Sequence, residues 1–532
     1  MGLTKVDVEG TGANQRNAIL TCNEPDSDVT FLQRFSHSVI VASRLARNNS
    51  TLRKKHCPMT NQILYWNEVA LEANRVDHTK DKEQAGPTLS SRALAIVHLA
   101  IYDAYAGVKN DPIGFPHYLP TLGSPGTPAS IDAAVAGAAC ATLTALYPKQ
   151  KAFFESKHLG AGLTGTAQEL NNGNAYGLLA AQAILKDRKD DPRGGDDGYS
   201  PSMARGAHRV DPDNPGQGFQ SPFYGKNSRC FAVTSRHGLT APPQPSDPVY
   251  TTALKEVRGR GIAPELLGTI NPHSAKRTVN QTLIGLYWAY DGAKDIGTPP
   301  RLYNQIVTAV AKEQGIDTDS DKLVKLFALV NAAMGDAGIL AWEQKYKHDL
   351  WRPVVGIREH DPSMGPTPLP GNDVDDDCDS SWLPLGAPNS NQTNAKNVTP
   401  NFPAYPSGHA TFGAAAFHIT RLFFDPALAG NRGDDTLFTG SFVSEELNGA
   451  TTDNKGAVRP KHLRNFPGGL WEMILENGRS RIYLGVHWIF DAFAPISATN
   501  RNPDFTQNIG GVPLGLNIAE DIFANGLQRS SV

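Results

Sequence analysis

The sequence has few cysteines, nearly balanced charges and no long basic run, and each of these shortages excludes a class of protein. Its five cysteines are scattered with no CxxC pair, which disfavours a zinc or iron–sulfur site, and the odd count leaves at least one thiol free. Lys and Arg total 50 against 53 for Asp and Glu, a net charge of -3, so no nucleic-acid partner is expected. A small-molecule enzyme fits this composition better.

Membrane signals are also scarce. No window approaches the roughly eighteen apolar residues of a membrane helix, and residues 1–6 lack the apolar core of a signal peptide. We therefore expect a soluble chain with no membrane partner. Asn-x-Ser/Thr triplets at Asn48, Asn280, Asn391 and Asn397 matter only in a secreted chain. The compartment stays open, with an extracytoplasmic location favoured although no signal peptide is visible.

Apolar residues recur at helical spacing through most of the chain, which predicts an all-α protein. The segments 129–147 and 174–187 are rich in Ala and Leu, which suits closely packed helix pairs. The full set of predicted helices is 62–75, 88–107, 129–147, 174–187, 273–290, 300–314, 320–350, 408–424, 466–480 and 485–493.

A length of 532 residues exceeds most single cores and favours two domains. We expect an irregular segment over 1–60, a first helical bundle over 61–260 and a second over 261–532. The Gly- and Pro-rich stretch 190–250 is predicted to be a long loop that wraps the surface. The fold class is therefore two four-helix-bundle-like halves with long wrapping loops and the active site in the C-terminal bundle. The acidic stretch 373–379 is interpreted as solvated surface, with ion binding the less favoured alternative.

One cluster of candidate functional residues consists of Lys345 and Arg352-Pro353. The two cations are seven residues apart, so we expect them on one face of a helix that begins near Leu323. Pro353 disfavours helical geometry at Arg352 and is predicted to end the helix there, at a rim where the guanidinium can take two oxygens of an anion. Taken alone, such a pair is more often a solvated helix face.

A second cluster is Pro406-Ser407-Gly408-His409, which precedes a plain helical run. Ser407 occupies an N-cap position, and Gly408 and His409 offer backbone N–H groups, which together form an anion site. His409 stands where an acid or base is useful. The alternative is an ordinary capped helix with a surface histidine.

The third cluster is Ser480-Arg481 followed by His487 and Asp491. His487 and Asp491 are four residues apart, so the carboxylate is predicted to orient the imidazole. Arg481 and His487 are six apart, about 120° around a continuous helix, so a shared ligand requires a break near Gly485. Without the other clusters, a core histidine–aspartate pair would be the usual interpretation.

Together these clusters form the pattern Lys-x6-Arg-Pro, Pro-Ser-Gly-His and Ser-Arg-x5-His-x3-Asp. This resembles the superfamily of type 2 phosphatidic acid phosphatases, bacterial acid phosphatases and vanadium-dependent haloperoxidases. From about residue 60 to 527 the chain is further similar to the fungal vanadium chloroperoxidases. The segments that carry this similarity are 63–68, 287–291, 297–304, 402–409, 444–449 and 510–515. The first 60 residues and 450–465 match less well.

The resemblance implies an enzyme with vanadate as its cofactor. By resemblance, His487 is the axial ligand to vanadium and His409 the acid or base, while the vanadate oxygens are held by Lys345, Arg352, Ser407, Gly408 and Arg481. It also implies that Asp291 pairs with Arg481 and that Asp491 supports His487.

Two aromatic residues, Trp342 and Phe402, match positions beside the halide site of the resembled family. Phe402 is the informative one, because the algal bromoperoxidases tend to carry histidine there and the chloroperoxidases phenylalanine. Chloride versus bromide preference nevertheless stays open.

The implied reaction is the oxidation of halide by hydrogen peroxide to hypohalous acid, which then halogenates small organic acceptors. His409 removes the peroxide proton, and Lys345 with the Gly408 N–H polarises the peroxide oxygens. No redox change at the metal is needed, which suits a chain without soft ligands. Assembly into a homo-oligomer is left open.

Two other functions are compatible with part of this pattern. An acid phosphatase would use His487 as the nucleophile, forming a phosphohistidine, and His409 to protonate the leaving group. A helical scaffold or anion-binding protein without catalysis is disfavoured, because no polar member of the site is missing.

Overall fold

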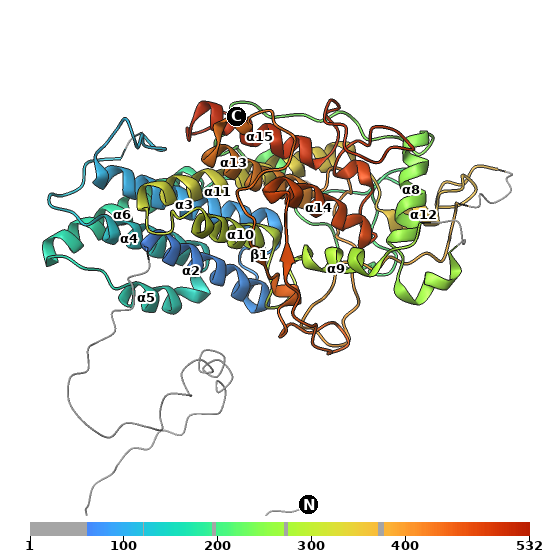
Figure 1. The fold of residues 1–532 in the computed structure, drawn as a ribbon, viewed down its shortest axis with the longest axis horizontal. Coiled ribbons are helices and arrows are strands. Elements are labelled where there is room, and N and C mark those ends of the chain that lie inside the picture. Colours follow the sequence, from blue (N-terminus) through green and yellow to red (C-terminus); the bar gives the residue numbers. More distant parts are fainter. Residues whose placement is uncertain (1–60, 121, 194–197, 271–274, 371–376) are drawn as a thin grey trace, which may run out of the picture. The chain divides into compact units, whose positions relative to one another are not determined.

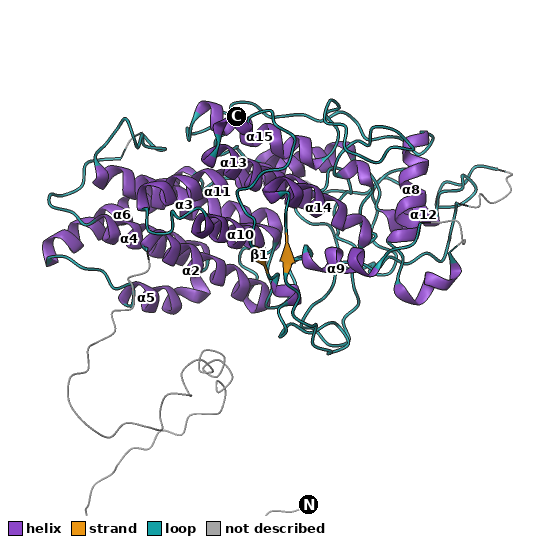
Figure 2. Ribbon diagram, in the orientation of Figure 1, coloured by secondary structure: helices purple, strands orange, loops and turns teal. Residues whose placement is uncertain are grey.

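The computed structural model describes residues 61–120, 122–193, 198–270, 275–370 and 377–532, so the predicted segment 1–60 lies outside it. Met59–Val532 forms one compact unit. Its described part is built almost entirely of helices joined by long loops (Figure 1 and Figure 2). The prediction of a mostly helical protein is therefore confirmed.

The α-helices are α2 (Gln62–Val76), α3 (Gly86–Lys109), α4 (Ile131–Leu146), α5 (Lys151–Leu159), α6 (Ala167–Asp187), α7 (Tyr224–Asn227), α8 (Pro248–Arg260), α9 (Val279–Tyr287), α10 (Pro299–Glu313), α11 (Ser320–His348), α12 (Pro353–Arg358), α13 (Gly408–Phe424), α14 (Gly469–Tyr483) and α15 (Gly511–Asn525). Short helical turns are η2 (Asp77–Asp81, π), η3 (Pro148–Gln150), η4 (Pro264–Thr269), η5 (Pro426–Leu428), η6 (Glu445–Leu447) and η7 (Ile489–Asp491). Strands β1 (Ser441–Phe442) and β2 (Arg464–Asn465) pair antiparallel, with Ser441 opposite Asn465.

The N-terminal helices pack closely around α3, which contacts α4, α6 and α11. A β-carbon on Gly177 of α6 would lie 2.1 Å from the Ala134 carbonyl oxygen of α4, so only glycine permits this approach. The predicted close helix pair is therefore confirmed. Helix α6 begins earlier than the predicted residue 174, because Thr166 and Glu169 form a capping box.

Helix α11 is the central element, since it contacts α3 on one side and α13 and α15 on the other. Among the described helices it alone is long and apolar enough to cross a membrane, yet 89% of its most apolar window is buried inside the protein. The expectation that no window approaches that length was wrong for this helix. Its burial explains the apolar composition.

The C-terminal helices surround α13, which packs on α11, α14 and α15. Helix α15 was not predicted, because Gly510, Gly511 and Pro513 mask its apolar face. The predicted helix 485–493 is wrong: the chain leaves α14 at Gly485, which has φ 75°, and only the single turn η7 follows.

The predicted surface loop 190–250 is partly buried. Cys230, Phe231 and Val233 are fully buried, because the Asp336 carboxylate of α11 accepts hydrogen bonds from three consecutive backbone N–H groups at 231–233. The expectation of a wholly superficial connection was therefore wrong.

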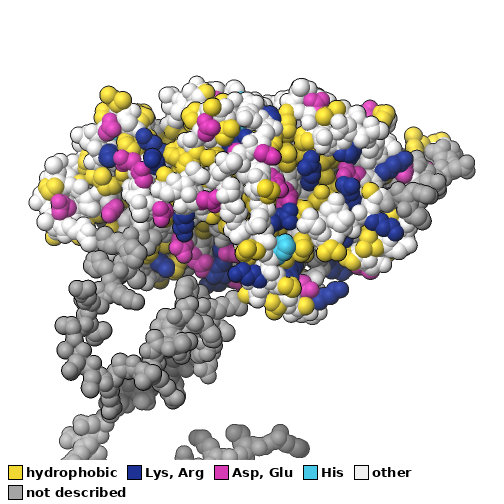
Figure 3. All heavy atoms as spheres, viewed as in Figure 1, with side chains coloured by type: hydrophobic (Ala, Val, Ile, Leu, Met, Phe, Trp, Pro, Cys, Tyr) yellow, Lys and Arg dark blue, Asp and Glu magenta, His cyan; other side chains and the backbone are white. Residues whose placement is uncertain are grey.

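Elsewhere on the surface, Figure 3 shows Lys and Arg side chains interspersed with Asp and Glu, in keeping with the balanced composition.

Candidate functional site

A cavity of about 150 Å³ brings the N-termini of three helices together. Gly86 and Pro87 open α3, Thr298 and Pro299 open α10, and Gly408 opens α13. Helix N-termini carry partial positive charge, so this arrangement favours an anion. The rest of the lining is Gln217, Gln220, Asp291, Trp342, 398–402, His409, Phe412, Arg481 and His487.

Lys345 lies in the last turn of α11 and is fully buried. Its ammonium donates to the carbonyl oxygens of Pro403 at 2.9 Å, Ala404 at 3.2 Å and Pro406 at 2.5 Å. Burial, together with the neighbouring Arg352, lowers the pKa of Lys345 well below its usual value. The three carbonyls oppose that shift, because they bind the charged form. Lys345 thus fixes the chain that leads into α13 and places a positive charge next to the start of that helix.

Arg352 does not share a helix face with Lys345, contrary to the prediction. Helix α11 ends at His348 because Asp349 adopts φ 48°, and Arg352 becomes the residue that precedes α12. Its guanidinium donates to the Phe402 carbonyl oxygen at 2.8 Å. The two cations are brought together by this turn rather than by helical periodicity.

Arg481 approaches the cavity from α14, fully buried. Its Nη2 donates to Asp291 Oδ1 at 2.7 Å, which is the predicted pairing. Nε and Nη1 of Arg481 and Nη2 of Arg352 are buried and lack a hydrogen-bond partner in the described protein. Buried charged donors without partners are costly, so these three groups are suited to an anion in the cavity.

Ser407 is the N-cap of α13, as predicted, and its hydroxyl accepts from the Ala410 backbone N–H at 3.4 Å. The Ser407 N–H donates to the Asp491 carbonyl oxygen at 2.8 Å. Gly408 lines the cavity at the start of the helix. The tetrapeptide therefore has the geometry of a helix-start anion site.

His409 is buried, and its Nε2 lies 2.6 Å from the Ala289 carbonyl oxygen and 4.0 Å from Asp291 Oδ1. A carbonyl at that distance requires the proton on Nε2, which leaves the lone pair on Nδ1. Burial, reinforced by Arg481, lowers the pKa of His409 to about 3. The imidazole is therefore neutral at neutral pH, the form that accepts a proton.

His487 follows the break at Gly485, and its Nδ1 lies 2.8 Å from Asp491 Oδ2. Asp491 fixes the tautomer, as predicted, although the pair lies in a capped turn and not on a helix. The Nε2 lone pair accepts from Arg352 Nη1 at 2.9 Å. Burial and the surrounding cations, Arg352 foremost, hold the pKa of His487 well below its usual value.

Trp342 and Phe402 form one wall of the cavity, with ring centroids 4.7 Å apart. The Phe402 ring lies 5.0 Å from Lys345 Nζ and 4.9 Å from the Arg352 guanidinium carbon. These contacts are cation–π interactions. The Trp342 indole N–H donates to the Gln220 carbonyl oxygen at 3.2 Å, which fixes the ring.

The site combines three buried cations, Lys345, Arg352 and Arg481, with the buried carboxylate of Asp491 and the partly buried carboxylate of Asp291. The excess of positive charge and the unpartnered N–H groups point to a tetrahedral oxyanion. Among the described residues, no group of three or more His, Cys, Asp or Glu side chains could hold a metal ion by itself.

Sequence reasoning missed the groups that support the site through backbone atoms. The Ala289 carbonyl on His409 and the carbonyls around Lys345 carry no side-chain signal. Residues 373–376 of the acidic stretch lie outside the described residues, and Asp377 lies 3.2 Å from Lys255 in an ion pair.

Solved structures with this architecture include a bacterial vanadium-dependent iodoperoxidase, at 18% identity and a TM-score of 0.61, covering 91% of this chain and 99% of that one. A holo-type bacterial vanadium-dependent chloroperoxidase has 14% identity and a TM-score of 0.55, covering 85% and 96% of the two chains. At these identities the likeness is one of fold.

Sequence comparison is more specific. Residues 56–218 match the vanadium chloroperoxidase N-terminal domain, and residues 325–501 match the second helical-bundle domain of the same family. Vanadium chloroperoxidase from Curvularia inaequalis is 35% identical over 88% of this chain and 90% of its own length. The chain therefore belongs to the vanadium chloroperoxidase family.

Proposed function

We propose that this chain is a vanadium-dependent haloperoxidase, which uses vanadate and hydrogen peroxide to oxidise chloride or bromide to hypohalous acid. The observation that carries the proposal is the set of unpartnered guanidinium N–H groups at one site. Two belong to Arg481, which lines the cavity together with His487, and one belongs to Arg352, which donates to His487. The net reaction consumes halide, hydrogen peroxide and a proton, and yields hypohalous acid and water.

The residues present fit vanadate. Its charge of about -1 to -2 suits three cations facing two carboxylates, and Ser407 and Gly408 begin a helix aimed at the cavity. His487 Nε2 is the proposed vanadium ligand. In this structure that lone pair accepts a hydrogen bond from Arg352, so vanadate binding would replace this hydrogen bond. When bound, vanadate supplies a Lewis acid that activates peroxide toward halide without changing its own oxidation state.

The chain's own residues account for proton movement and charge stabilisation. His409 takes the peroxide proton at Nδ1, because Nε2 is already bonded to the Ala289 carbonyl. Asp291 orients Arg481, and Asp491 keeps the His487 proton on Nδ1. Lys345 holds the chain that leads into α13, and its positive charge stabilises negative charge in the cavity. The Gly408 N–H adds a hydrogen-bond donor.

Trp342 and Phe402 are the proposed walls of the halide site. Their rings exclude water beside the cations, which favours a weakly hydrated anion. The cavity is small, about 150 Å³, so we expect the hypohalous acid to leave it before a bulky organic acceptor is halogenated. Small organic acceptors are thus partners in solution.

We also propose that the helices divide into two bundle-like halves, 61–260 and 261–532, each resembling a four-helix bundle. The support is the packing of α4 and α6 on α3 and of α14 and α15 on α13, with α11 shared between the groups. Arg352, His409 and His487 all belong to the second half.

The test measures chlorination and bromination of monochlorodimedone with hydrogen peroxide, before and after loading orthovanadate. Hydrolysis of p-nitrophenyl phosphate by the unloaded protein is the comparison. Vanadate-dependent halogenation supports the proposal. Brisk phosphate release without halogenation would instead make His487 a phosphorylated nucleophile and the chain an acid phosphatase.

A further inference from the structure

The loop between α9 and α10 presents two groups to the catalytic cavity. The Ala289 carbonyl oxygen lies 2.6 Å from His409 Nε2, and Asp291 lies 2.7 Å from Arg481 Nη2. Tyr290 stands between these two groups, fully buried, with φ 45°. A bulky residue in this left-handed region is strained and persists only where its surroundings hold it there. What fixes Tyr290 therefore also fixes its neighbours.

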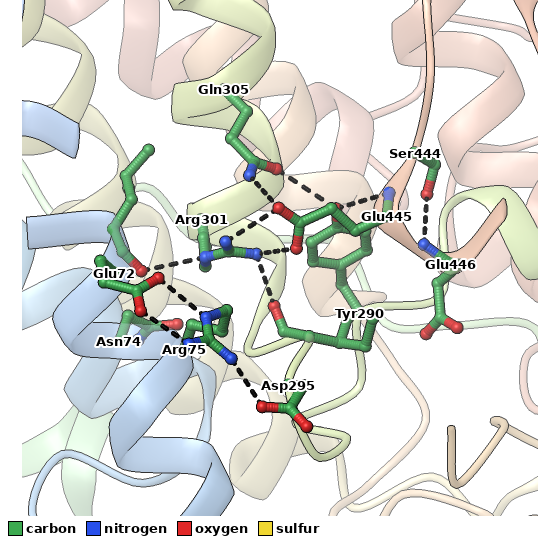
Figure 4. A network of polar contacts seen from close by, with 12 residues as sticks. Glu72, Asn74, Arg75, Tyr290, Asp295, Arg301, Gln305, Ser444, Glu445 and Glu446 are labelled. Carbon is green, nitrogen blue, oxygen red and sulfur yellow. Dashed lines mark hydrogen bonds and ion pairs between the residues drawn. The ribbon is translucent and has the colours of Figure 1, made fainter. Parts of the chain in front are cut away.

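The Tyr290 hydroxyl closes a ring of hydrogen bonds (Figure 4). It donates to Gln305 Oε1 at 3.2 Å and accepts from the Glu445 backbone N–H at 3.0 Å. Gln305 Nε2 then donates to Glu445 Oε1 at 2.9 Å. The hydroxyl is thus held from two sides by groups far apart in the sequence.

Arg301 joins this ring to the other end of the loop, as Figure 4 shows. Its guanidinium binds both carboxylate oxygens of Glu445 and donates to the Ile296 carbonyl oxygen at 2.9 Å. Asp295 is in turn paired with Arg75 of α2 at 2.6 Å. The loop is therefore anchored at Tyr290, between Ala289 and Asp291, and again at Asp295 and Ile296.

We propose that Tyr290 is a positioning residue, whose anchored hydroxyl holds the Ala289 carbonyl against His409. Through the same anchor it holds Asp291 against Arg481. The first contact keeps the proton on Nε2 of His409, and the second directs the remaining N–H groups of Arg481. This inference rests on the proposed function for its catalytic meaning, but both contacts are properties of the unloaded protein.

The charged groups near His409 give the direction of the expected effect. Asp291 and the Ala289 carbonyl raise its proton affinity, whereas Arg481 and Lys345 lower it. If Tyr290 loses its anchor, the loop relaxes and the two groups that raise the affinity withdraw together. His409 then becomes harder to protonate, and Arg481 loses its fixed orientation.

Tyr290→Phe in the full chain is the test, because it removes the hydroxyl and keeps the ring. Tyr287→Phe is the matched control: Tyr287 is equally buried, but its hydroxyl donates only to the Phe442 carbonyl oxygen at 3.4 Å. Gln305→Leu is a second variant, which breaks the ring of hydrogen bonds but leaves the Tyr290 side chain unchanged. Orthovanadate affinity is measured by calorimetry, and the acid limb of the kcat/KM profile for peroxide is measured in bromide oxidation.

We expect Tyr290→Phe and Gln305→Leu to weaken orthovanadate binding about tenfold and to move the acid limb to lower pH, with Tyr287→Phe unchanged in both. Equal behaviour of Tyr290→Phe and Tyr287→Phe in both measurements would overturn the inference. Failure of the proposed function is distinguishable, because then the wild-type protein itself shows no vanadate-dependent halide oxidation, while the affinity comparison still decides the role of Tyr290.

Discussion

His487 and Asp491 form a fixed pair: Nδ1 of the imidazole lies 2.8 Å from Oδ2 of a carboxylate that also accepts from the Trp488 backbone N–H at 3.0 Å. The carboxylate cannot rotate without losing one of these bonds. The Nε2 lone pair therefore stays directed toward the guanidinium of Arg352.

Replacing His487 with Ala should abolish vanadate retention, because no other imidazole lone pair is held in that position by a carboxylate. We expect at least a 100-fold loss of orthovanadate affinity by calorimetry, and a smaller loss, about 10- to 100-fold, for Asp491→Asn. His418→Gln is the control, since His418 is buried beside Glu520 and does not line the cavity. Tight binding by the His487 variant would contradict its assignment as ligand.

Replacing His409 with Ala should spare vanadate binding and mainly remove chlorination. General acid–base catalysis contributes about 10²–10⁴-fold, so kcat should fall by that order while affinity changes little. In the wild-type protein the base is lost only as the pH falls through about 3, the pKa of His409, so peroxide kcat/KM should hold down to acidic pH. An unchanged kcat in the variant would rule His409 out as the base.

Phe402→His should lower the ratio of chloride to bromide oxidation. An imidazole brings water to a wall that is now apolar, and chloride, the more strongly hydrated halide, depends more on a dry site. Phe402→Leu keeps the wall apolar and is the matched control. Steady-state rates with both halides check this, and an unchanged ratio in Phe402→His would show that the ring does not set halide preference.

His98 should make the protein less stable in acid. Its imidazole is fully buried, with Nε2 3.1 Å from Asn67 Oδ1, and burial lowers its pKa to about 3. The folded pKa lies below the unfolded value of about 6.5, so the stability it contributes is present above that pH and is lost as the pH falls toward 3. The Tm of His98→Gln should approach or exceed that of wild type on acidification. A Tm difference constant over this range would contradict the prediction.

The sequence could predict contacts within the second and third clusters, because each of these clusters is local in the chain. Ser407 precedes a helical run and Asp491 follows His487 by four residues, so spacing alone predicts their contacts. The cavity walls could not be predicted in this way. Gln220 and Gly86 come from distant loops and helix ends, and their approach depends on tertiary packing rather than periodicity.

The errors have the same cause. The spacing of Lys345 and Arg352 predicts a shared helix face, but Asp349 takes a left-handed conformation that no periodic pattern signals. Gly485 was correctly predicted as a break, because the two cluster residues on either side could not otherwise meet. The helix predicted beyond it failed, because Trp488 and Asp491 cap a single turn instead.

The excess of positive charge around the cavity leaves electrostatic repulsion uncompensated in the unloaded protein. Folding brings Lys345, Arg352 and Arg481 together against their mutual repulsion. Any tetrahedral anion that enters the cavity reduces this repulsion. Phosphate has the same shape and similar charge as vanadate, so we expect phosphate to compete with vanadate for the cavity in phosphate-rich solution. Assembly of the working enzyme is then an exchange of one oxyanion for another, and the concentration ratio of the two decides which form of the protein exists.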